Sequence, residues 1–131
     1  MTQSGRYLLD TNIVIAMFAG EAAIQERRPN ADKVYLPSIV VGELCYGARK
    51  SSRPIENLAR VNRLTQDVQV IPCNLETAQW YGIIKDRLHR KGRLIPDNDI
   101  WIAAVAIQRG LILATRDAHF DEVEILHTER W

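Results

Sequence analysis

The chain has 131 residues, of which 47% are hydrophobic and 25% are charged, and its formal net charge is +1. This composition is typical of a globular protein and excludes fibrous and disordered classes, while the length suits a single domain, which we expect to span residues 1–131. Because the net charge is close to zero, any binding of nucleic acid has to rely on a local basic patch.

The sequence predicts short apolar strands that alternate with helices. In chain order these are a strand at 7–9, helices at 12–19 and 21–30, a strand at 34–36, and helices at 38–50 and from Pro54 onward. They continue with a strand at 68–71, helices at 75–90 and 98–109, a strand at 111–114 and an edge strand at 123–126. Such alternation, with strands apolar throughout, predicts a three-layer α/β/α fold around a short central parallel sheet.

Several residues mark where the predicted helices begin and end. Ser38 is a good N-cap for the helix that follows the second strand, and Pro54 suits a first helical turn. Gly20, Gly92 and Gly110 each follow a helical pattern and predict its C-terminal end.

The sequence gives no sign of secretion or of a membrane span. Its N-terminal part lacks a basic segment followed by a long apolar run, and no apolar stretch approaches the roughly 20 residues that cross a bilayer. We therefore expect a cytoplasmic protein with no membrane contact. The two cysteines, Cys45 and Cys73, form no C-x-x-C pair, so we expect reduced, buried thiols and no zinc site.

Four acidic residues occur where one element gives way to the next or just inside a helix: Asp10, Glu43, Asp99 and Asp117. The carboxyl ends of parallel strands meet at one crevice, so we expect these side chains to gather there. Grouped carboxylates repel one another unless a cation holds them, and oxygen ligands are those that Mg²⁺ and Mn²⁺ prefer. The sequence therefore predicts a divalent metal site.

Each acidic residue also has a structural interpretation. Asp10 is a good N-cap for the next helix, Glu43 suits a solvated helix face, and Asp117 suits a turn. Asp97 lies two residues before Asp99 in a helix-start pattern, where capping is its favoured role. Asp99 would then lie in the first turn, where the helix dipole keeps a carboxylate ionised.

Other polar residues have weaker signals. Gly42, beside Glu43, permits close packing, Thr115 could orient a carboxylate, and Arg116 could meet a phosphate. A basic run could guide RNA or could equally be a solvated helix end; its members are Lys85, Arg87, Arg90, Lys91 and Arg93, with a smaller group at Arg49, Lys50 and Arg53. The three histidines, His89, His119 and His127, are scattered and offer no obvious pair for a metal-free ribonuclease mechanism.

Taken together, the motifs resemble those of the PIN-domain ribonucleases, specifically the VapC-type toxins of toxin–antitoxin pairs. The resemblance runs from Tyr7 to Trp131. It is carried by four stretches in the same order, which are Leu8-Leu9-Asp10-Thr11-Asn12, Val41-Gly42-Glu43-Leu44 with Tyr46-Gly47-Ala48, Asp99-Ile100-Trp101-Ile102-Ala103-Ala104, and Thr115-Arg116-Asp117 with His119-Phe120.

The resemblance implies an activity and a set of site residues. It implies a Mg²⁺- or Mn²⁺-dependent endoribonuclease whose catalytic residues are Asp10, Glu43, Asp99 and Asp117, with metal held by the three aspartates. Asn12 and Thr115 match positions that support such a site. The family partners would be an RNA substrate and a VapB-type antitoxin, and such toxins commonly form homodimers.

Two other functions fit the same residues. One is a PIN-fold nuclease of RNA maturation or decay outside a toxin–antitoxin pair, and the other is a non-catalytic module whose acids only hold an ion. A homodimer is also suggested by apolar and aromatic residues that a small domain has difficulty burying, namely Tyr46, Trp80, Tyr81 and Ile84; the alternative is that they fill the core.

Overall fold

One all-parallel sheet organises the molecule. The computed structural model describes residues 5–31 and 33–131, and within these residues the strand order is β3-β2-β1-β4-β5 with every neighbouring pair parallel. The strands are β1 (Arg6–Leu9), β2 (Lys33–Pro37), β3 (Gln69–Ile71), β4 (Ile112–Ala114) and β5 (Thr128–Glu129). Parallel strands cannot be joined by tight turns, so the connections between neighbouring strands carry the helices.

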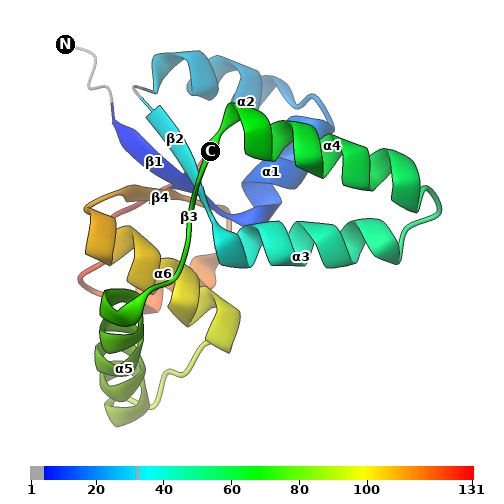
Figure 1. Ribbon diagram of the computed structural model, residues 1–131. Helices are drawn as coiled ribbons and strands as arrows, with labels where there is room; N and C mark the ends of the chain where they lie inside the picture. The colour runs from blue at the N-terminus through cyan, green and yellow to red at the C-terminus, as the bar shows by residue number, and fades with distance from the viewer. Residues whose placement is uncertain (1–4, 32) are drawn as a thin grey trace.

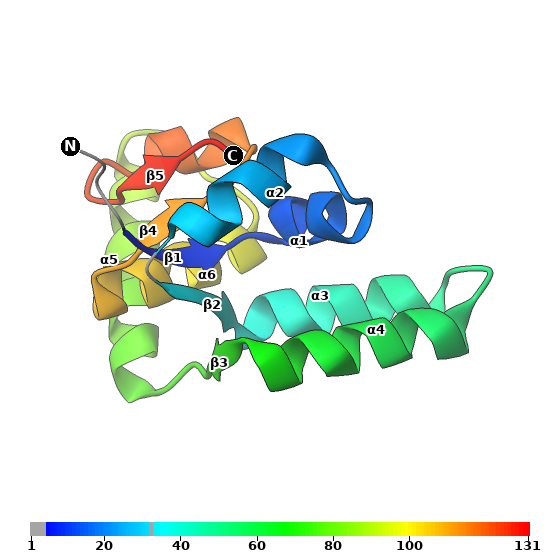
Figure 2. The same ribbon diagram turned by 90° about the horizontal axis from the view of Figure 1, so that it is seen from above.

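The helices cover the sheet and extend beyond it. They are α1 (Thr11–Phe18), α2 (Ala22–Arg27), α3 (Ser38–Arg49), α4 (Pro54–Asp67), α5 (Leu75–Arg90) and α6 (Asp97–Arg109), with 3₁₀ turns η1 (Arg28–Asn30) and η2 (Ala118–Glu122). Figures 1 and 2 show α2 on one side of the sheet and α5 with α6 on the other, while α3 and α4 form a hairpin that projects as an arm. The predicted α/β fold with a central parallel sheet is confirmed.

The core lies between the central strands and α6. Leu8 and Leu9 of β1 and Leu113 of β4 are fully buried, as is the run Ile102–Ala106 of α6. Burying a leucine-sized side chain stabilises a fold by about 1.5–3 kcal/mol. The two central strands are therefore fixed firmly beside each other, and this holds the residues at their carboxyl ends in register.

Two local predictions need correction. Ser38 is not an N-cap, because the cap is Pro37 and Ser38 is already the first residue of α3. The edge strand predicted at 123–126 is wrong, since these residues form turns and the edge strand is β5, further along the chain. The reason is that Phe120 and Val123 are buried in the core, which turns the chain before it can pair with β4.

The expected helix ends are present. Gly20, Gly92 and Gly110 have φ values of +72°, +68° and +64°, a conformation that glycine adopts without strain. None of the helices among the described residues is long and apolar enough to cross a bilayer. Cys45 and Cys73 are free thiols, as expected, but they are only partly buried; burial raises the pKa of the Cys73 thiol.

Candidate metal centre

The site lies where β1 and β4 end side by side. Leu9 pairs with Ala114, and the amide of Asp10 then donates to the carbonyl of Ala114 at 3.0 Å. This pairing places Asp10 beside Thr115, although the two are 105 positions apart in the sequence. The beginning of α6 contributes Asp99 to the same end of the sheet, and α3 contributes Glu43.

Asp10 has the capping role expected of it and lies among the acidic residues at this end of the sheet. It caps α1 by accepting the Thr11 amide at 2.8 Å, and it also accepts from Thr115 Oγ1 at 2.7 Å and Asn12 Nδ2 at 3.3 Å. Burial raises the pKa of this carboxyl, the hydrogen bonds from Thr115 and Thr11 oppose the rise, and the nearby charge of Asp117 adds to it. Asn12 also accepts the Arg116 amide, so it joins the two strand ends.

Asp99 lies in the first turn of α6, and its side chain is 15% exposed. Burial raises its pKa to about 6; the bond from His119 opposes the rise, and the charges of Asp10 and Asp117 reinforce it. Like charges crowd this position, so a bound cation would be stabilised strongly here.

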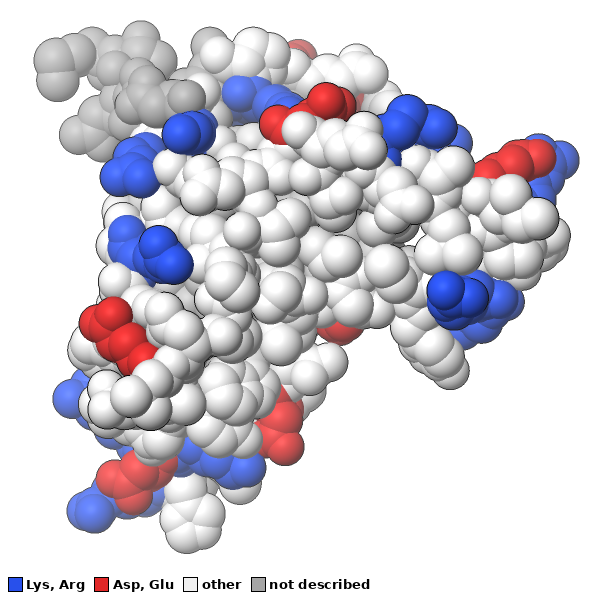
Figure 3. All heavy atoms as spheres, in the orientation of Figure 1, with Lys and Arg blue, Asp and Glu red and all other residues white. Residues whose placement is uncertain are grey.

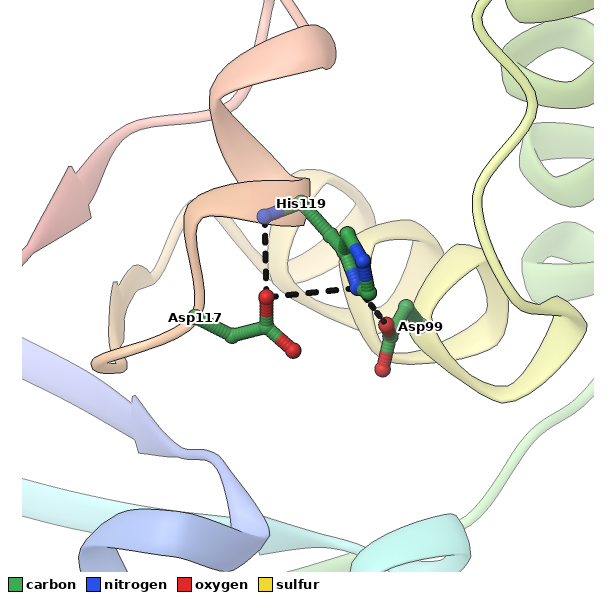
Figure 4. A group of neighbouring side chains, drawn as sticks. All are labelled: Asp99, Asp117 and His119. Atoms are coloured by element: carbon green, nitrogen blue, oxygen red, sulfur yellow. Dashed lines mark hydrogen bonds and ion pairs between the residues drawn. The ribbon is translucent and has the colours of Figure 1, made fainter.

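His119 completes a close group with Asp99 and Asp117, shown in Figure 4. Its Nδ1 lies 3.2 Å from Asp117 Oδ1 and 3.3 Å from Asp99 Oδ2. One donor atom from each of the three residues lies within 4.8 Å of the other two. Sequence reasoning did not place His119 in the site; its position two residues after Asp117, in a turn that reverses the chain, was the signal available.

Glu43 lies near this group but does not belong to it. Its carboxylate accepts from Thr11 Oγ1 at 2.9 Å, so α3 is tied to the start of α1 beside Asp10. Among the described residues, the group with mutually close donor atoms includes neither Glu43 nor Asp10. The expectation that Gly42 permits close packing is wrong, because a Cβ added there would meet nothing within 4 Å.

Asp97 forms its hydrogen bonds with residues of α5. Its carboxylate accepts from Lys85 Nζ and from the Tyr81 hydroxyl, both at 3.0 Å, and the Lys85 bond lowers the pKa of Asp97. It makes no capping bond, since Pro96 is the cap of α6, so the capping role expected for Asp97 is wrong. The structure thus brings Asp99, and not Asp97, beside Asp117 and His119.

Several cations expected near substrate have acidic partners. Arg116 pairs with Glu21 at 3.0 Å and donates from Nε to the Trp131 carbonyl at 2.7 Å, so it ties the beginning of α2 to the last residue of the chain. In the basic run, Lys85, Arg90 and Lys91 lie within ion-pair distance of acidic side chains. The second basic group lies at the tip of the arm, where α3 gives way to α4.

A groove opens next to the site. It has a volume of about 400 Å³ and lies between α1 and the α3–α4 arm, with Ile15, Phe18, Leu44 and Arg60 in its lining and Glu43 at the site. Figure 3 shows a separate indentation of the outline, between the arm and the part formed by α5 and α6, whose residues do not line this groove. Carboxylate oxygens dominate the donor set beside this opening, which fits a hard divalent cation of the Mg²⁺ or Mn²⁺ type.

Comparison with known proteins gives consistent matches over nearly the whole chain. Residues 7–126 match the model of the PIN domain. The chain is 38% identical to Ribonuclease VapC2 of Haemophilus influenzae and 36% identical to the tRNA(fMet)-specific endonuclease VapC of Shigella flexneri, in both cases over 96% of this chain and 98% of the relative. It superposes with a TM-score of 0.89 and 27% identity on the crystal structure of VapBC2 from Rickettsia felis bound to a DNA fragment from their promoter, covering 96% of this chain and 98% of that one.

Proposed function

The chain belongs to the PIN-domain family, and from this membership we propose that it is a VapC-type toxin, an endoribonuclease that hydrolyses RNA phosphodiester bonds. The observation that carries the proposal is the convergence of Asp10, Asp99 and Asp117 at the ends of β1 and β4, where their charges act on one another. The chain is 38% identical to Ribonuclease VapC2 of Haemophilus influenzae over 96% of its length, which supports the same activity.

We propose that Asp10, Asp99 and Asp117 hold Mg²⁺ or Mn²⁺ and that Glu43 is the fourth catalytic residue. When bound, the ion would generate a nucleophilic water and neutralise charge on the phosphate undergoing attack. Thr115 fixes the Asp10 carboxylate through its 2.7 Å bond. Asn12 holds the neighbouring loop by bonding both Asp10 and the Arg116 amide.

The proposed partner is a VapB-type antitoxin that occupies the groove beside the site. Ile15 is 57% exposed and lies in the groove together with Phe18, so an apolar segment could bury surface there. A cation on that segment would compensate the carboxylates as a metal does. We propose that the activity occurs in the cytoplasm, because an RNA substrate and such a partner would be met there.

A homodimer is also proposed, but on fewer residues than the sequence suggested. Ile84 is 2% exposed and belongs to the core, Trp80 packs against the core, and Tyr81 stacks on Trp101 with ring centroids 4.2 Å apart. Tyr46 and Ile55, at 67% and 84% exposed, remain available on the arm. The arm is therefore the surface on which we expect a second copy.

The central test is cleavage of RNA by the purified chain with and without metal. EDTA should abolish cleavage, and Mg²⁺ or Mn²⁺ should restore it. Because water is the nucleophile, the products should carry 5′-phosphate and 3′-hydroxyl ends. Asp10→Asn and Asp99→Asn should each lose most of the activity, whereas Asp97→Asn should retain it. Full activity in EDTA, or 2′,3′-cyclic phosphate ends, would contradict the proposal.

A further inference from the structure

We propose that His119 is a direct ligand of the metal ion through Nδ1 and that it shifts the preference of the site from Mg²⁺ toward Mn²⁺ and other transition ions. The inference rests on the proposed function, because it assigns an additional ligand to the same ion. Imidazole nitrogen suits transition ions, whereas Mg²⁺ favours oxygen ligands. A site made of carboxylates alone would therefore favour Mg²⁺ more than a site that includes His119.

The position of the imidazole nitrogen supports direct ligation. Adjacent ligand atoms on an octahedral ion with bonds near 2.1 Å are about 3.0 Å apart. Nδ1 of His119 lies 3.2 Å from Asp117 Oδ1 and 3.3 Å from Asp99 Oδ2, close to that separation from both carboxylates at once. The three side chains thus present one nitrogen and two oxygens to a common point (Figure 4).

The backbone that carries His119 is held in place. Its amide donates to Asp117 Oδ1 at 2.9 Å, which caps η2, and the next residue, Phe120, is fully buried in the core. The side chain itself is 54% exposed, so an ion arriving from solvent can reach it. A ligand on a fixed turn needs little ordering when the metal binds.

A neutral ligand also suits the charge of this position. Asp10, Asp99 and Asp117 already repel one another, and a further carboxylate would add to that repulsion. The alternative is that His119 only hydrogen-bonds to the carboxylates and an incoming ion displaces it. The two roles predict opposite changes in metal affinity when His119 is removed, because losing a ligand weakens metal binding and losing a competitor strengthens it.

The test measures Mn²⁺ binding to the untagged full chain by EPR titration and by pulsed EPR, with Mg²⁺ as a competitor. The variants are His119→Ala and, as a matched control, His89→Ala on the exposed last turn of α5. We expect ¹⁴N coupling to bound Mn²⁺ in the natural chain and in the control, and its loss in His119→Ala. Mn²⁺ affinity should fall at least about tenfold in His119→Ala, by comparison with the effect of losing groups that merely orient ligands, and Mg²⁺ affinity should fall less.

Three outcomes would overturn the inference. Mn²⁺ that binds without ¹⁴N coupling, or with coupling that persists in His119→Ala, shows that His119 is not a ligand. Equal or tighter Mn²⁺ binding by His119→Ala shows that the histidine competes with the ion. In each of these cases the metal-dependent nuclease stands; if the natural chain binds no Mn²⁺ and cleaves RNA in EDTA, the proposed function fails as well.

Discussion

The residue Asp10 is only 5% exposed, and three hydrogen-bond donors bind its carboxylate in place of water. Burial disfavours its charge, and the donors restore part of the stabilisation that water would give. Helix capping and site formation therefore depend on the same two oxygens. A change that removes one donor should alter the chemistry of the site before it alters the fold.

Thr115→Val tests this dependence. The substitution keeps the shape but removes the bond to Asp10 and the acceptor of the Asp117 amide. Without the bond from Thr115 the pKa of Asp10 should rise, and kcat/KM should fall more at pH 6 than at pH 8. We expect a loss on the order of tenfold at the lower pH, from one charge-assisted hydrogen bond. Thr65→Val is the control, because that hydroxyl bonds only within α4. An equal loss at both pH values would point to a disturbed fold.

Asp99→Asn should stabilise the chain when metal is absent. The folded pKa of about 6 lies above the ordinary 3.8, so the folded state binds the proton more tightly and stability falls as pH rises from about 4 to about 6. In EDTA at pH 8 the variant should unfold with a free energy higher by on the order of 2 kcal/mol, with little difference near pH 4. Thermal denaturation followed by circular dichroism measures this.

The control for that experiment is Asp97→Asn, which should behave in the opposite direction. The pKa of Asp97 is lowered by Lys85, so its charge stabilises the fold above the ordinary pKa of an aspartate. The variant should not gain stability at pH 8. If Asp99→Asn also fails to gain, the fold does not raise the pKa of Asp99 in the way that its burial beside other carboxylates implies.

At the scale of elements, the sequence was a good guide wherever the pattern was local. Strand positions such as 7–9 and helix ends such as Gly110 depend on neighbouring residues, and both were confirmed. The strand expected at 123–126 failed because the burial of Phe120 is a tertiary effect. His119 was missed for the same reason: its spacing from Asp117 is visible in the sequence, but its proximity to Asp99 depends on how η2 lies against α6.

Two glycine substitutions should have opposite effects. Gly110→Ala places a side chain at φ +64° and should cost about 1 kcal/mol, although an added Cβ meets nothing within 4 Å. Gly82→Ala lies inside α5, where the added Cβ also has free space, and should stabilise by about 0.5–1 kcal/mol. Urea denaturation gives both values, and a gain at Gly110 would contradict the conformational explanation.

At the scale of the molecule, the groove and the arm can be tested separately. Ile15→Asp should abolish binding of the antitoxin and leave RNA cleavage unchanged, because Ile15 lines the groove and is not among the residues that we propose to hold the metal. Calorimetry with a co-encoded partner and a cleavage assay measure the two effects. Antitoxin binding that survives the substitution would place the partner elsewhere.

Light scattering of the isolated chain should show about twice the monomer mass, and Tyr46→Asp on the arm should reduce it to the monomer. A monomer at tens of micromolar that remains active would defeat the dimer and favour a role in RNA maturation. We also predict that residues 1–131 form a single domain.

The pairing of β1 with β4 also governs when a newly made chain becomes dangerous to its cell. Asp10 and Thr115 are 105 positions apart, and ribosomes add about 5–20 residues per second. Each nascent chain therefore spends about 5 to 20 s with Asp10 synthesised and the proposed metal site still impossible to assemble. The antitoxin that we propose as its partner would have that interval in which to reach it.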